Sequence, residues 1–139
     1  MSAKQNPPFR AEHIGSLLRP RSIPDAFRAL RAGDIDDAEF NRVREAAIRD
    51  VVKLQEDAGL QFVTDGEFRR TTYISHFVES CDGLDFRPSS FRFYDTDGKD
   101  HEFMAPRCVG KVKRTQALSA IEFEFLKTVT DKTVKSTYA

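Results

Sequence analysis

The feature that most limits what this chain can fold into is a change of hydrophobic period between residues 36 and 64. Apolar side chains first recur at steps of three and four residues, which predicts one buried stripe on a helix of about five turns. The stripe consists of Phe40, Val43, Ala47, Val51, Leu54 and Ala58. Gly59 then predicts a left-handed end to the helix, and residues 60–64 are a compact run of strand-favouring side chains. A helix followed directly by a strand is typical of α/β proteins, in which helices connect parallel strands.

The rest of the chain continues this alternation. Helix starts are indicated by Ser22 with Asp25 and by Asp36 with Glu39, because both pairs have the spacing of a capping box. The other predicted elements are a strand at residues 9–14, helices at 22–32, 72–80 and 118–130, a hairpin of 91–94 and 101–104, and strands at 108–112 and 133–137. We therefore expect an α/β fold with a parallel sheet, helices over it and one inserted hairpin. The polar, proline-containing residues 1–8 are expected to form a flexible N-terminus.

Composition excludes several classes of protein. Of the 139 residues 40% are apolar and 32% charged, a balance typical of a globular chain. The 22 basic and 22 acidic side chains cancel, so no net field favours nucleic acid or an anionic membrane surface. No apolar run has the ~18 residues of a membrane-spanning helix, and the N-terminus lacks the apolar core of a secretory signal. The expected location is the cytoplasm.

The familiar cofactor motifs are missing from the sequence. Cys81 and Cys108 lie far apart with no neighbouring ligand spacing, so we expect reduced thiols and no local zinc site. The acidic run at residues 95–100 lacks the glycine and glutamate positions of a calcium loop and is predicted to be the hairpin turn. Neither a GxGxxG nor a GxxxxGK[ST] phosphate loop occurs, and no GxSxG elbow is present.

Two polar loops directly follow predicted strands, at residues 13–19 and 65–70. The carboxyl ends of parallel strands share one edge of a sheet, where such folds bind ligands, so both loops are candidates for a site. Gly15 and Ser16 could offer backbone N–H groups and a hydroxyl to a carboxylate, or could form an ordinary turn. Asp65 and Glu67 could bind an ammonium group, or could form a solvated acidic turn paired with Arg69 or Arg70.

The histidines are weaker candidates. His13 sits in an apolar strand pattern, which favours a structural or supporting role over metal ligation. His76 and His101 fall in a predicted helix and in the hairpin, and neither has a second ligand at a suitable spacing. We expect both to be structural or exposed.

Two motifs in these loops resemble the catalytic barrel of cobalamin-independent methionine synthases. They are residues 10–20, RAEHIGSLLRP, and residues 63–70, VTDGEFRR, followed by YISHF at 73–77 and CDGL at 81–84. The resemblance covers nearly the whole chain from about residue 9. A histidine before Ile-Gly-Ser, with Leu-Leu-Arg-Pro after it, is similar to shorter single-barrel members such as epoxyalkane:coenzyme M transferase.

The resemblance implies a fold and a set of roles. The fold would be the first three or so units of a (β/α)8 barrel, spanning residues 9–139. Ile14, Gly15 and Ser16 would line the pocket of a thiol substrate, with Ser16 at the carboxylate when the thiol is homocysteine. Glu67 would bind the ammonium group beside Asp65, which stands where many members carry histidine. His13 and Arg19 would support these residues from behind.

The same resemblance implies zinc and a methyl donor such as methyltetrahydrofolate. Zinc would bind the thiol as a thiolate and so supply a nucleophile at neutral pH. Its histidine, cysteine and glutamate ligands would lie downstream of these residues, because a complete barrel takes ~250 residues. The 139 residues by themselves are therefore expected to lack metal and activity.

An open barrel would also leave strand edges unpaired, so self-association is expected; a monomeric, cooperatively melting species in sedimentation and calorimetry would contradict this. The alternatives are a small non-catalytic α/β module that binds an amino acid or thiol, and a subunit that assembles with a separately encoded remainder.

Overall fold

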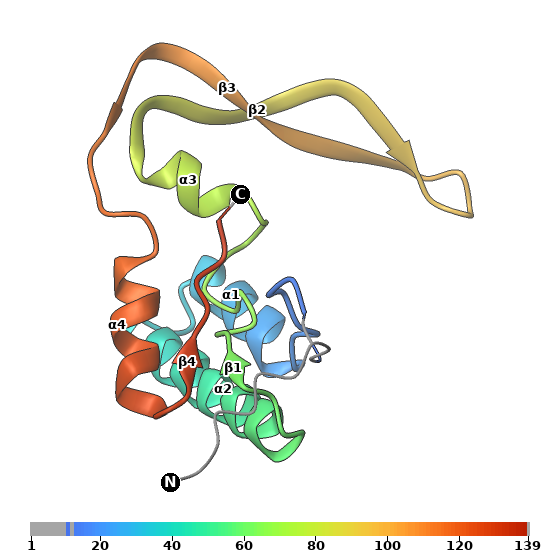
Figure 1. Ribbon diagram of the computed structural model, residues 1–139. Helices are drawn as coiled ribbons and strands as arrows, with labels where there is room; N and C mark the ends of the chain where they lie inside the picture. The colour runs from blue at the N-terminus through green and yellow to red at the C-terminus, as the bar shows by residue number, and fades with distance from the viewer. Residues whose placement is uncertain (1–10, 12, 139) are drawn as a thin grey trace, which may run out of the picture. The chain divides into compact units, whose positions relative to one another are not determined.

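The computed structural model describes residues 11 and 13–138. The chain divides into two compact units. The first, called here the strand–helix unit, comprises the chain up to Arg69 together with residues 121–137. The second, called the hairpin unit, comprises residues 70–120 with Tyr138. Figure 1 shows the elements of both, which are described separately below.

Two helices open the strand–helix unit, at α1 (Ser22–Ala32) and α2 (Asp37–Asp57). Asp36 caps α2 as predicted, because its side chain accepts a hydrogen bond from the Glu39 N–H at 2.8 Å. The predicted capping box at Ser22 is wrong: Arg21 is the N-cap residue, no side chain caps α1, and Ser22 is already helical. Gly33 ends α1 in a left-handed conformation, with a φ of 79°.

The core of this unit forms between the helices and a short parallel sheet. Strand β1 (Phe62–Val63) pairs with β4 (Thr133–Val134), which follows α4 (Ala120–Val129). The buried apolar cluster consists of Ile23, Ala47, Ile48, Val51, Val52, Val63, Phe68 and Leu126. The stripe predicted for α2 needs correction, because Leu54 is 64% exposed whereas Gln55 is 3% exposed.

The buried Gln55 amide pairs backbone groups at the end of β1. Its Nε2 donates to the Thr64 carbonyl and its Oε1 accepts from the Thr64 N–H, each at 2.9 Å. These are the backbone groups that a neighbouring strand would otherwise pair. A strand was expected at residues 9–14. Of these, residues 11, 13 and 14 are described and are not in a strand, whereas Phe9, Arg10 and Glu12 lie outside the described residues. The predicted flexible N-terminus at residues 1–8 also lies outside them.

The hairpin unit contains α3 (Ser75–Glu79) and the long antiparallel strands β2 (Cys81–Tyr94) and β3 (Asp100–Arg114). The turn at residues 95–99 forms as predicted: the Asp95 carboxylate accepts from the N–H groups of Asp97 and Lys99, and Gly98 has a φ of 75°. The separate strand predicted at 108–112 is wrong, because these residues continue β3, with Cys108 opposite Leu84. The paired strands extend from the turn back to Cys81 and Arg114 (Figure 1).

The described part of the chain is therefore a mixed α/β structure in which the strands form two two-stranded sheets. Within that part, no helix combines the length and apolar character needed to cross a membrane.

Candidate functional site

The two loops singled out from the sequence lie against each other in the strand–helix unit. The Leu17 N–H donates to the Gly66 carbonyl at 3.1 Å, and the Thr64 hydroxyl donates to the Gly15 carbonyl at 2.7 Å. The Arg19 guanidinium donates to the Glu67 carbonyl at 3.1 Å. The second loop leaves the carboxyl end of β1, the edge at which parallel strands present ligand-binding loops. The structure thus brings residues 13–19 and 65–67 into one site.

The turn at residues 65–67 has an unusual backbone. Gly66 and Glu67 both have positive φ angles, 68° and 61°, and the latter is sparsely populated for a residue with a side chain. Asp65 supports it, because its carboxylate accepts the Glu67 N–H at 2.9 Å. Backbone strain of this kind persists where the surroundings enforce it and is concentrated at functional sites.

The sequence allowed two interpretations of this turn, an ammonium-binding site or a solvated acidic turn, and the burial of its carboxylates distinguishes between them. Asp65 is 5% exposed and Glu67 is 8% exposed, so the turn is not a solvated acidic one. Buried carboxylates are costly unless charges or hydrogen bonds compensate them. The sequence suggested Arg69 or Arg70 as a partner of this turn. Arg69 forms an ion pair with Glu45 on α2, at 3.7 Å.

A group of charged side chains surrounds this turn. The Arg69 guanidinium, whose side chain is 10% exposed, lies 4.6 Å from the centre of the Phe125 ring of α4. Burial lowers the pKa of Arg44, and the nearby Arg69 lowers it further. Glu45, Glu122 and Asp65 act in the opposite direction on the same pKa. Charged groups of α2, α4 and the turn therefore all act on the pKa of Arg44.

The first loop is more open. Ile14 is 90% exposed and Ser16 is exposed, whereas Gly15 between them is buried. His13 lies within hydrogen-bond distance of Gln55, with Nε2 and Oε1 3.0 Å apart. The exposed hydroxyl of Ser16 is thus accessible to a ligand, while His13 connects the N-terminal end of the loop to Gln55 of α2.

Residues after β4 belong to the same site, and the sequence analysis did not identify them. Lys135 continues the β1–β4 pairing through its N–H, which donates to the Val63 carbonyl at 2.9 Å, and its ammonium group donates to the His13 carbonyl at 2.5 Å. Thr137 packs against Gly15. A signal was available: the strand predicted at 133–137 would end at the same edge as the strand before residues 65–70.

The described residues do not fit a zinc ion. Within residues 11 and 13–138, no three His, Cys, Asp or Glu side chains are grouped so that they could hold a metal. Cys81 is buried, and Cys108 is exposed with its thiol donating to the Gly110 carbonyl at 3.1 Å. His76 instead accepts the Ser119 N–H at 2.9 Å, and His101 lies 2.9 Å from Asp95.

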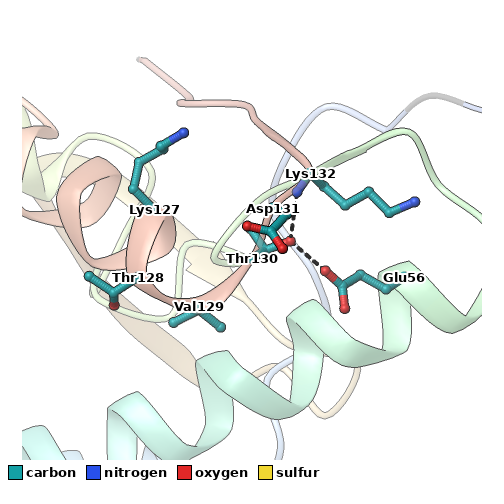
Figure 2. A pocket seen from close by; sticks show the side chains of 7 residues that line it. All are labelled: Glu56, Lys127, Thr128, Val129, Thr130, Asp131 and Lys132. Carbon is teal, nitrogen blue, oxygen red and sulfur yellow. Dashed lines mark hydrogen bonds between the residues drawn. The ribbon is translucent and has the colours of Figure 1, made fainter.

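A separate cavity of about 520 Å³ lies at the opposite end of the strand pair, where the chain passes from α4 to β4. Figure 2 shows its lining by Glu56 and residues 127–132. Thr130 donates to the Glu56 carboxylate and accepts the Lys132 N–H, which fastens this connection to α2. The cavity lies away from the carboxyl ends of the parallel strands, where open α/β sheets bind ligands, so we assign it a structural role.

Comparison with known proteins identifies the class to which this fold and site belong. The profile of the cobalamin-independent synthase catalytic domain matches residues 9–138, and the chain belongs to that family. Relatives include the uncharacterised protein YxjH of Bacillus subtilis, 33% identical over 86% of this chain and 31% of that protein. A 5-methyltetrahydropteroyltriglutamate–homocysteine methyltransferase of Mycobacterium tuberculosis is 33% identical over 93% of this chain and 17% of that protein.

Solved structures agree with this membership. A candidate vitamin B12-independent methionine synthase from Listeria monocytogenes matches with a TM-score of 0.66 and 30% identity, over 91% of this chain and 34% of the other. A B12-independent methionine synthase from Shewanella sp. W3-18-1, in complex with selenomethionine, matches with a TM-score of 0.57 and 25% identity, over 72% and 28% of the two chains. The chain therefore spans between about a sixth and a third of the length of these relatives.

Proposed function

We propose that this chain supplies the first strand–helix units of a (β/α)8-barrel methyl- or alkyltransferase, and with them part of the pocket for a thiol substrate. The observation that carries the proposal is the hydrogen-bonded junction of residues 13–19 with residues 65–67 beside the carboxyl end of β1. A barrel enzyme builds its active site from loops in this position.

Each residue of the junction has a proposed task. The exposed Ser16 hydroxyl and the neighbouring backbone meet the carboxylate of an amino-acid thiol such as homocysteine, and Ile14 contacts its apolar carbons. Glu67 accepts hydrogen bonds from the substrate ammonium group, while Asp65 holds the Glu67 backbone. Arg19 and His13 keep the two loops in place.

The proposal includes a zinc ion and a methyl donor such as methyltetrahydrofolate, as the family resemblance implies. Zinc would lower the pKa of the substrate thiol. The described residues do not fit the metal, so its ligands would come from other parts of a full-length enzyme. The chain's own contribution is to bind and orient the amino-acid end of the thiol.

Calorimetric titration of the chain with L-homocysteine, and separately with coenzyme M, tests the proposal. In the full-length transferase, replacing Glu67 with Gln should weaken homocysteine binding by ~1.5 to 3 kcal/mol, because a charge-assisted hydrogen bond is lost. Glu124→Gln is the matched control, since Glu124 is exposed on α4. Unchanged affinity in Glu67→Gln would remove this residue from the site.

The titration also separates the proposal from its alternative. Tight binding by the 139-residue chain without metal favours a non-catalytic binding module. Binding that requires zinc together with the longer sequence of a full-length relative favours the transferase. Co-purification with a separate polypeptide would indicate a subunit of an assembled barrel.

A further inference from the structure

The carboxyl end of β4 faces the first loop from one side. Val63 and Val134 both pack with the apolar cluster beneath the helices. Successive side chains of a strand point to opposite faces, so Thr64 and Lys135, the next residues of the paired strands, project from the other face. This is the face on which the first loop lies.

From that face the two side chains bind alternate carbonyl groups of the loop. The Thr64 hydroxyl donates to the carbonyl of Gly15, and the Lys135 ammonium group donates to the carbonyl of His13. The lysine bond joins residues 122 positions apart in sequence and is partly buried. A charge-assisted bond of this kind is about twice as strong as a neutral one.

Thr137 fixes the same segment by close contact. A Cβ atom placed on Gly15 would lie 2.0 Å from the Thr137 Cγ2 atom, and Gly15 has a φ of 156°. A side chain at residue 15 would therefore force the Thr137 side chain to shift, which favours glycine at this position. His13 and Gly15 are therefore both contacted by residues that follow β4, and Ser16 is the next residue of the loop.

We propose that Lys135 and Thr137 are positioning residues that fix the backbone of residues 13–16, and that they thereby set the affinity of Ser16 for an anionic group, carboxylate or sulfonate, on the thiol. The recognition part rests on the proposed function of Ser16. The positioning part rests on the contacts of Lys135 and Thr137 alone. Lys135 also adds positive charge beside the loop, which favours an anionic ligand over a neutral one.

Hydrogen exchange of the 139-residue chain tests the positioning part without any ligand. In Lys135→Met, the amides of residues 13–17 should exchange about tenfold faster, because a bond of roughly 1.4 kcal/mol is lost. Lys135→Arg should restore most of the protection, and Lys132→Met, which changes an exposed lysine before β4, should have no effect. The core amides of Ile48 and Val52 report global unfolding and should stay unchanged in Lys135→Arg. Equal exchange at 13–17 in wild type and Lys135→Met overturns the positioning role.

Comparing the affinities of two thiols, one with a carboxylate and one without, tests whether Lys135 affects recognition of the anionic group. L-homocysteine and 3-amino-1-propanethiol differ by the carboxylate. Lys135→Met should weaken homocysteine about fivefold to tenfold and leave the aminothiol unchanged, with Lys135→Arg close to wild type. Equal weakening of both thiols overturns the recognition role while leaving the proposed function intact. If neither thiol binds when the chain is joined to the remaining sequence of a full-length relative and zinc is present, the proposed function and the recognition role both fail, and hydrogen exchange alone decides the positioning role.

Discussion

The two units of this chain bury their apolar side chains to very different degrees. In the strand–helix unit Ile23, Ile48 and Val63 have no exposed surface, whereas in the hairpin unit Phe91, Phe93 and Tyr94 are 74%, 58% and 65% exposed. The difference follows from architecture, because helices cover one face of the β1–β4 pair while a two-stranded ribbon has little to pack against. Strand-like patterning in a sequence therefore indicates extended backbone without indicating burial.

The largest expected effect comes from removing core volume. Ile48→Ala should lower the free energy of unfolding of the strand–helix unit by about 2 to 5 kcal/mol, because it leaves a cavity among close-packed side chains. Phe93→Ala is the matched change in the hairpin and should cost less than about 1.5 kcal/mol, mainly its edge contact with Phe103. Urea unfolding followed by far-UV circular dichroism measures both, and equal costs would contradict the contrast between the units.

The second effect compares one glycine in each unit. Gly15→Ala should destabilise by about 2 to 4 kcal/mol, since the new methyl meets Thr137 and the backbone angle disfavours a side chain. Gly98→Ala should cost only about 1 kcal/mol, because Gly98 is in a left-handed conformation with nothing within 4 Å of the added atom. Adding Thr137→Ala should recover part of the loss in Gly15→Ala. No recovery in that double variant would show that the close contact is unimportant.

The smallest effect concerns the pH dependence of the hairpin turn. The His101 hydrogen bond, and then the Lys99 N–H, lower the pKa of Asp95 below its usual value of 3.8. The ionised carboxylate therefore favours the folded turn above that value, and this contribution is lost as the pH falls through the lower folded-state pKa. Amide protection of Asp97 and Lys99 should decline in this acidic range while that of Ile48 persists. Asp95→Asn should abolish this pH dependence of amide protection. If the pH dependence is unchanged in Asp95→Asn, Asp95 is not its cause.

Much of the fold followed from local pattern. Helix α2 begins at its predicted cap and ends beside Gly59, α1 spans the predicted residues, and the Asp-Gly turn reverses the hairpin. These features depend on neighbours a few residues apart, which sequence displays directly. The strand expected at 108–112 was misassigned because a strand's period cannot reveal its partner: the same residues would suit a parallel or an antiparallel neighbour.

In the candidate site, too, some features follow from local sequence and others only from tertiary contacts. The sequence by itself determined which loops carry the polar groups, because Ser16 and Glu67 sit in turn sequences directly after predicted strands. Only the tertiary structure decided that Gln55 pairs the Thr64 backbone, that Glu67 adopts a left-handed conformation, and that Lys135 reaches the His13 carbonyl. The Lys135 contact joins residues 122 positions apart, and all three features depend on close packing and on the need to satisfy buried polar groups, which select partners that no local pattern specifies.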